Sequence, residues 1–188
     1  NKKKKNWNWK ENSPVMSKQW LGLVVRTVLY LLMQVIVLKE IRLGTGEIPG
    51  VAILVYPVIL LTLPLQIPQF FILLLSFFIG SLVDLFYLSP GVHAGACLWM
   101  MLFRPLALRL LEPKNGYPTD ASPTISDLGV VWFSQYAGML LAIFFLCYFV
   151  LKVFTFVYID QILIGAMLSL FVSGIIIFLL QLFFSFRS

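Results

Sequence analysis

The chain has 188 residues, 60% of them hydrophobic, with a mean hydropathy of +0.94, which exceeds the apolar share of about 45–50% in soluble domains and favours an integral membrane protein. The net charge of +6 comes largely from six lysines that precede the first apolar run, a distribution that suits anionic lipid rather than nucleic acid. Two cysteines and one histidine suggest no disulfide framework and are too few for a zinc site, so no cofactor is expected.

The chain is predicted to begin with a basic cytoplasmic tail over residues 1–19, followed by a membrane domain over residues 20–188. Met16 is a candidate natural start, which would make the residues before it an extension. Because several apolar runs reach the ~20 residues that cross the bilayer as a helix, we expect an all-α, polytopic bundle of six transmembrane helices. The expected helices cover approximately residues 20–38, 50–63, 69–88, 91–111, 128–151 and 157–184.

The first two expected helices each carry an unusual feature. In the first, Arg26, Tyr30 and Gln34 recur every four residues and therefore share one face. Either this polar ridge places Arg26 at the interface and bonds Gln34 to a neighbouring helix, or it faces a cavity or a partner helix. In the second, Pro57 removes an intrahelical hydrogen bond and predicts a kink, and Pro64 ends the helix.

The third expected helix carries an acidic residue within hydrocarbon. Ser76, Gly80 and Asp84 are spaced by four, so they share a helix face that suits close packing and ends in a charge. A carboxylate in hydrocarbon costs several kcal/mol unless it is paired or reaches water. Asp84 is therefore a candidate functional residue.

A tight turn at Pro90 and Gly91 leads into the fourth expected helix and brings His93, the only histidine, to the depth of Asp84. Asp84 is expected to pair with His93 or with the free amides at the start of that helix. This helical hairpin is the predicted site. Either it supports a partner protein, or Asp84 only caps the helix that follows.

The fourth expected helix carries Arg104 and Arg109 in its inner half. Arg104 lies roughly 15 Å deeper than Asp84 by helical rise, so a direct bridge between them is not expected. We expect both arginines to reach the inner interface, with contact to a cytoplasmic partner as the alternative. The polar loop over residues 112–127 is expected to be a solvated connector or a docking loop.

Small residues also recur on the last two expected helices, and their spacing predicts helix-packing seams. The fifth helix carries Ser134, Gly138 and Ala142, and the sixth carries Gly165, Ala166, Ser169, Ser173 and Gly174. Together with the Ser76 seam, they predict a compact bundle. Most basic residues lie in the tail or on the same side of the membrane as the tail, which predicts that both termini are cytoplasmic.

The sequence shows no nucleophile with a base, no paired carboxylates and no cluster of metal ligands, so we expect a protein that is not an enzyme. A proton-coupled carrier would use Asp84 and His93 as a relay. No inverted repeat is evident in the sequence, which argues against a carrier.

The hairpin contains two short motifs, Ile79-Gly80-Ser81-Leu82-Val83-Asp84 and Ser89-Pro90-Gly91-Val92-His93-Ala94. Both resemble the signature of the MreD family, the rod-shape-determining membrane proteins of bacteria. The surrounding frame is similar in order and spacing, and consists of Gln34, Leu63-Pro64-Leu65-Gln66-Ile67-Pro68, Phe103-Arg104-Pro105 and Glu112-Pro113. The resemblance covers about residues 16–188.

The resemblance implies a non-enzymatic scaffold in the bacterial cytoplasmic (inner) membrane that supports lateral peptidoglycan synthesis and cell shape. Such a protein would bind MreC through that partner's single transmembrane helix. It would support RodA with its penicillin-binding protein and connect them to MreB filaments inside the cell. In this role we expect Asp84 and His93 to lock the hairpin, while Gly80 and Gly91 permit close approach of its helices.

The MreD family is also similar in fold to the six-helix substrate-binding (S) components of energy-coupling-factor vitamin transporters. This similarity supplies the alternative function, a vitamin-binding subunit. Such a subunit often carries an Ala-x-x-x-Ala seam on its first helix, and residues 23–30 lack that seam. The scaffold is therefore the favoured interpretation.

Overall fold

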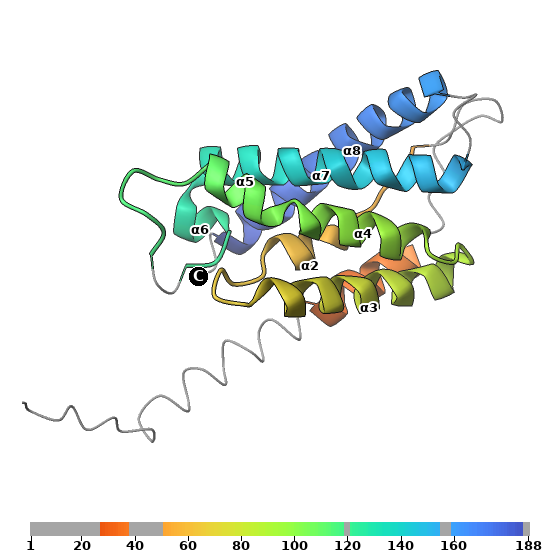
Figure 1. Ribbon diagram of the computed structural model, residues 1–188. Coiled ribbons are helices and arrows are strands. Elements are labelled where there is room, and N and C mark those ends of the chain that lie inside the picture. The colour runs from red at the N-terminus through yellow and green to blue at the C-terminus, as the bar shows by residue number, and fades with distance from the viewer. Residues whose placement is uncertain (1–26, 38–50, 119–120, 155–158, 186–188) are drawn as a thin grey trace, which may run out of the picture.

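The computed structural model describes residues 27–37, 51–118, 121–154 and 159–185. Within these ranges the regular elements are all helical, which confirms the expected all-α class (Figure 1). In chain order they are the π-helical turn η1 (Met33–Val37), which continues a helix from Thr27, and the helices α2 (Pro57–Leu61), α3 (Gln69–Tyr87), α4 (Val92–Leu102), α5 (Arg104–Leu110), α6 (Ile125–Leu128), α7 (Val130–Val153) and α8 (Ile159–Ser185). The predicted tail over residues 1–19 and the first part of the first predicted helix lie outside the described residues.

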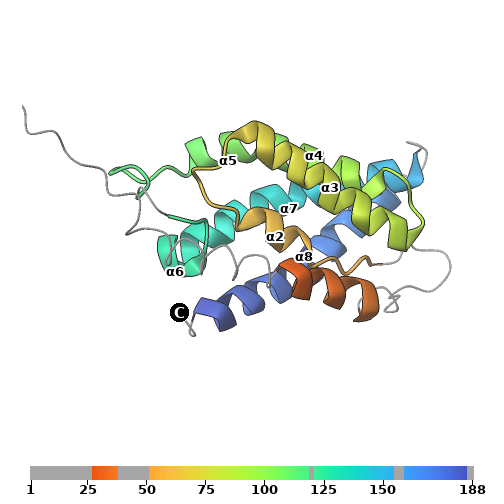
Figure 2. The ribbon, with the colours of Figure 1, turned by 90° about the horizontal axis from the view of Figure 1, so that it is seen from below.

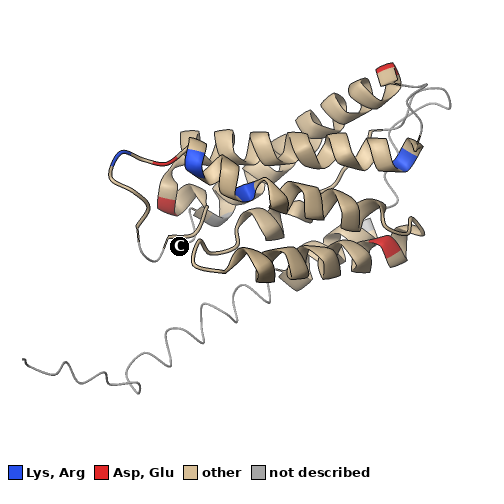
Figure 3. Ribbon diagram, viewed as in Figure 1, with Lys and Arg blue, Asp and Glu red and all other residues tan. Residues whose placement is uncertain are grey.

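Three helices, α3, α7 and α8, are long and apolar enough to cross a membrane. They contain 19, 24 and 27 residues, close to or above the ~20 that a span requires. The charged residues of the described chain lie toward the two ends of the bundle (Figure 3). This distribution is expected of a membrane protein, because charged side chains favour the interfaces over the hydrocarbon.

The long helices pack in sequence from one side of the molecule to the other. Helices α3 and α4 form an antiparallel hairpin, α4 packs on α7, and α7 packs on α8 (Figures 1 and 2). The short helix α2 lies inside this arrangement, and all of its residues are buried. The ends of α3, α7 and α8 lie within two residues of the predicted ends.

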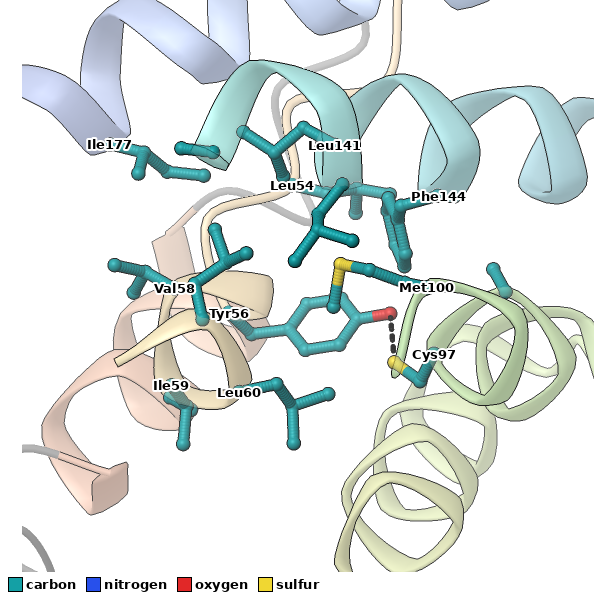
Figure 4. Packing of buried hydrophobic residues seen from close by; sticks show 14 of the residues in the cluster. Leu54, Tyr56, Val58, Ile59, Leu60, Cys97, Met100, Leu141, Phe144 and Ile177 are labelled. Atoms are coloured by element: carbon teal, nitrogen blue, oxygen red, sulfur yellow. Dashed lines mark hydrogen bonds between the residues drawn. The ribbon is translucent and has the colours of Figure 1, made fainter. Parts of the chain in front are cut away.

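The buried core forms where α2, α4 and α7 meet. Tyr56, which directly precedes α2, points between α4 and α7 (Figure 4). Its ring meets the ring of Phe144 edge-on, with the centroids 5.9 Å apart. Its hydroxyl accepts a hydrogen bond from the thiol of Cys97, with an Sγ–Oη distance of 3.6 Å. Tyr56 therefore joins three elements with a single side chain.

The prediction of a second transmembrane helix over residues 50–63 is wrong. Residues 51–55 are not helical, and α2 is only five residues long. The sequence favours this change, because Val51, Ile53 and Val55 are β-branched and β-branched residues have a lower helix propensity. We call residues 51–56 the buried segment, since from Ile53 onward its side chains are at most 8% exposed.

The buried segment is not helical, so its backbone groups need hydrogen-bond partners elsewhere. Side chains from two helices supply them. Gln34 accepts from the amide of Val55 at 2.8 Å and donates to the carbonyl of Ile53 at 3.1 Å. The hydroxyls of Ser169 and Ser173 in α8 accept hydrogen bonds from two backbone amides of the same segment, at 2.9 and 3.0 Å. Non-helical backbone at membrane depth is tolerated when it is satisfied inside the protein in this way. Gln34 thus bonds to a neighbouring segment rather than facing a cavity.

The fourth predicted helix, over residues 91–111, is divided at Phe103 into α4 and α5. Pro105 explains the division, because it has no N–H to donate to the carbonyl of Met101 four residues earlier. That carbonyl instead accepts a hydrogen bond from Gln69 Nε2 at 2.6 Å. The interruption therefore leaves no orphaned acceptor at Met101.

Of the three predicted seams of small residues, those on α3 and α8 form buried contacts, and the one on α7 does not. Ser76 is buried on α3, and a Cβ on Gly165 would lie 2.8 Å from the ring of Phe149. The prediction that Ser134 and Gly138 pack against another helix is wrong, because both are exposed. They line a groove of about 300 Å³ between α7 and α8. The two helices are in close contact at Gly165 and separated at Gly138, so the bundle is less compact than predicted.

Candidate functional site

The turn between α3 and α4 reverses the chain within four residues. Leu88 and Gly91 both adopt left-handed backbone conformations, with φ of 53° and 85°. The amide of Ser89 donates to the carbonyl of Asp84 at 3.2 Å, which closes the end of α3. Pro90 lies between the two left-handed residues, in the part of the turn that is exposed. The turn places the first residues of α4 directly beside the last turn of α3.

The carboxylate of Asp84 binds the start of α4. Oδ2 accepts from the amides of Gly91 and Ala94, at 3.1 and 3.0 Å. Oδ1 accepts from the amide of His93 at 2.9 Å and from the hydroxyl of Ser89 at 3.1 Å. The first amides of a helix have no intrahelical partner, so Asp84 caps α4 from a different helix. The Asp84 side chain is only 6% exposed.

His93 also pairs with the same carboxylate, so both pairings predicted for Asp84 are present. Its Nδ1 lies 2.9 Å from Asp84 Oδ1. The imidazole is 1% exposed and packs among three tyrosine rings, with centroid distances of 4.9 Å to Tyr87, 5.1 Å to Tyr148 and 6.0 Å to Tyr56. His93 therefore connects the hairpin to α7 and to the buried segment.

Gly80 allows the two helices of the hairpin to touch. A Cβ built on it would lie 2.4 Å from Cα of Ala94 and 2.7 Å from its nitrogen, which are backbone atoms that cannot rotate away. Gly91 has a different role from the predicted one, because a Cβ there would meet nothing within 4 Å. Its positive φ, rather than a close approach, favours glycine at that position.

Arg104 is buried, which contradicts the prediction that it reaches the interface or a cytoplasmic partner. Its side chain is 2% exposed, and its Nη2 donates to the carbonyls of Leu63 and Pro64, at 2.6 and 3.2 Å. Its Nε donates to the hydroxyl of Tyr136 at 3.2 Å. The guanidinium thus satisfies the carbonyls that follow α2, where prolines interrupt the helix. Arg109 is exposed, so the prediction of a cytoplasmic contact still applies to it.

We expect Arg104→Leu to lower the free energy of unfolding by about 1.5–3 kcal/mol, because it leaves the buried carbonyls of Leu63 and Pro64 without a donor. The midpoint of unfolding in a titration with sodium dodecyl sulfate measures this loss. Arg109→Leu removes the same charge from an exposed position and is the matched control. Equal midpoints for the two variants would show that the buried contacts contribute nothing.

Sequence reasoning missed the tyrosines around His93. Tyr56, Tyr87 and Tyr148 come from three separate regions, and no spacing relates them to the histidine. Tyr87 offered a partial signal, since it lies one helical turn after Asp84. Its hydroxyl accepts a hydrogen bond from Gln34 Nε2 at 2.6 Å. Gln34 therefore links α3, through Tyr87, to the buried segment.

The arrangement is suited to holding helices together. Within the described ranges, no three His, Cys, Asp or Glu side chains are grouped so that they could hold a metal ion. Fold and site together define a helical membrane protein in which an acid–histidine pair ties two antiparallel helices to the core. In comparisons with protein families, curated proteins and solved structures, this chain has no match.

Proposed function

We propose that this protein is a non-enzymatic membrane scaffold of the bacterial cell-elongation complex, as its resemblance to MreD implies. The proposal rests on the hydrogen bonds that the Asp84 carboxylate accepts. Its two oxygens engage four N–H or O–H groups and the His93 ring, all within the following turn and helix. A proton relay needs a carboxylate that is free to exchange partners, whereas a scaffold needs one that fixes a shape.

The proposed topology has six spans with both termini in the cytoplasm. Helices α4 and α5 together would form one span, since their 11 and 7 residues extend roughly 27 Å by helical rise. The buried segment followed by α2 would form another, because non-helical backbone covers up to ~3.3 Å per residue. This topology puts the turn between α3 and α4 on the outer side of the cytoplasmic membrane, where it would present a fixed surface to partners.

The proposed partner is MreC, whose single transmembrane helix would pack on this protein. Association of helices in lipid relies on small residues that let backbones approach closely. The groove between α7 and α8 supports the proposal, because Gly138 and Gly174 line it and neither has a neighbour within 4 Å of its Cβ position. Through MreC, the scaffold would support RodA with its penicillin-binding protein and connect them to MreB.

Co-purification tests this function. We expect a tagged version of the chain, extracted from native membranes in mild detergent, to retain MreC in a fixed ratio. Cells depleted of the protein should lose their rod shape. Recovery of the chain with a bound vitamin-sized metabolite and without MreC would instead support the vitamin-binding alternative and overturn the scaffold.

Within this proposal, we expect Gly138→Leu to reduce the recovery of MreC at least several-fold, because the new side chain fills the groove. The variant should still fold, since the position is open. Leu163→Phe adds bulk at an exposed position near the start of α8, away from the groove, and is the control. If wild-type protein retains MreC and Gly138→Leu retains it equally, the partner helix binds elsewhere and the scaffold proposal stands.

A further inference from the structure

Arg104 carries a buried positive charge that no acid in the described part of the chain neutralises. The buried carboxylate of Asp84 pairs with His93 instead. Of the acids that follow α5 in the chain, Glu112 and Asp127 are exposed, and Asp120 lies outside the described residues. An unpaired charge in a medium of low dielectric constant is costly, so a compensating anion would stabilise the protein.

One edge of the Arg104 guanidinium is also unused. Nε donates to Tyr136 and Nη2 donates to the carbonyls of Leu63 and Pro64. Nη1, which carries two further N–H groups, donates to none of the described residues. The two N–H groups of Nη1 can donate to the oxygens of an anion, and a phosphate group, which arginine commonly binds, presents several such oxygens.

The guanidinium binds a turn that reaches the protein surface. The carbonyls that it binds belong to the turn between α2 and α3, and Pro68 of the same turn is exposed. Arg109, at the end of α5, and Lys114, in the loop that follows, are exposed as well. Basic residues near a membrane surface attract anionic headgroups by about 1 kcal/mol each. They would raise the local concentration of an anion beside Arg104.

We propose that Arg104 is the centre of an anion site that binds a phosphate group at this end of the bundle, supplied either by an anionic phospholipid or by free phosphate. The buried guanidinium provides the direct contact, and the exposed cations provide attraction at longer range. The site is independent of the scaffold function, because it requires neither MreC nor the α3–α4 hairpin.

Competition between lipids tests the proposal. The full-length chain in detergent is mixed with equal amounts of phosphatidylglycerol and phosphatidylcholine, and native mass spectrometry counts the bound copies of each. We expect a several-fold preference for phosphatidylglycerol that Arg104→Gln abolishes and Arg109→Gln largely keeps. Inorganic phosphate that displaces the lipid at millimolar concentration would identify free phosphate as a ligand, and persistence of the lipid would assign the site to headgroups.

A labelling experiment on the unsubstituted chain removes any dependence on the folding of variants. Phenylglyoxal modifies arginine, and peptide mass spectrometry reports the extent at Arg104 and Arg109 separately. We expect phosphatidylglycerol or phosphate to reduce labelling of Arg104 several-fold relative to phosphatidylcholine. Unchanged labelling of Arg104, or equal lipid preference in wild type and Arg104→Gln, would overturn the site.

Discussion

Asp84→Leu is expected to lower the free energy of unfolding by about 3–5 kcal/mol, the range seen when one partner of a buried charged contact is removed. Leucine leaves the amides of Gly91, His93 and Ala94 with no acceptor at the start of α4. The hairpin should then open at its tip. Unfolding midpoints in sodium dodecyl sulfate measure the loss, and co-purification measures the accompanying loss of MreC.

Asp160→Leu is the matched control for this substitution. Asp160 is an exposed acid in the first turn of α8, so its removal changes the net charge equally without touching the hairpin. We expect its unfolding free energy to lie within about 0.5 kcal/mol of wild type. Normal stability, MreC recovery and cell shape in Asp84→Leu would show that the carboxylate does not lock the hairpin.

Gly80→Ala is expected to destabilise the protein by about 1–3 kcal/mol, the usual cost of overpacking, although it adds only one methyl group. The new Cβ would lie 2.4 Å from Cα of Ala94, so α3 and α4 must move apart. A second substitution, Ala94→Gly, should not restore stability, because the clash is with backbone atoms rather than with the alanine methyl. The same detergent titration measures both variants.

Gly138→Ala adds the same methyl group as Gly80→Ala, but we expect the opposite effect on stability. A Cβ at this position meets nothing within 4 Å. Alanine is favoured over glycine in a helix interior by about 0.5–1 kcal/mol, so this variant should be neutral or slightly more stable. A loss of stability in Gly138→Ala as large as that in Gly80→Ala would show that the close backbone approach at Gly80 is not what makes that position sensitive.

The α3–α4 hairpin could be predicted from the sequence because its determinants are local. Asp84 and His93 lie nine residues apart on either side of a Pro-Gly turn, and the depth of each follows from helical rise. A charged residue in an apolar run requires a partner, and the histidine and the first amides of the next helix lie within reach. The structure contains both contacts.

The buried segment could not be predicted, because its stability depends on residues far away in the chain. Hydropathy gives an apolar run the same score whether it is helical or irregular. The alternatives differ only in whether distant side chains can satisfy the backbone, and here the partners are Gln34, Ser169 and Ser173. The burial of Arg104 was missed for the same reason, since the two carbonyls that it binds lie about 40 residues earlier in the chain and Tyr136 lies 32 residues later.

The buried segment also imposes an order on the biogenesis of the protein. Two of its amides are bound by serines of α8, more than a hundred residues later in the chain. A ribosome that has released residues 51–56 into the membrane has already made Gln34, but it has not yet made the two serines that complete the hydrogen bonding of this segment. Until α8 is inserted, residues 51–56 must stay near water or remain bound to the insertion machinery. A nascent chain truncated before α8 would therefore be a target for membrane proteases.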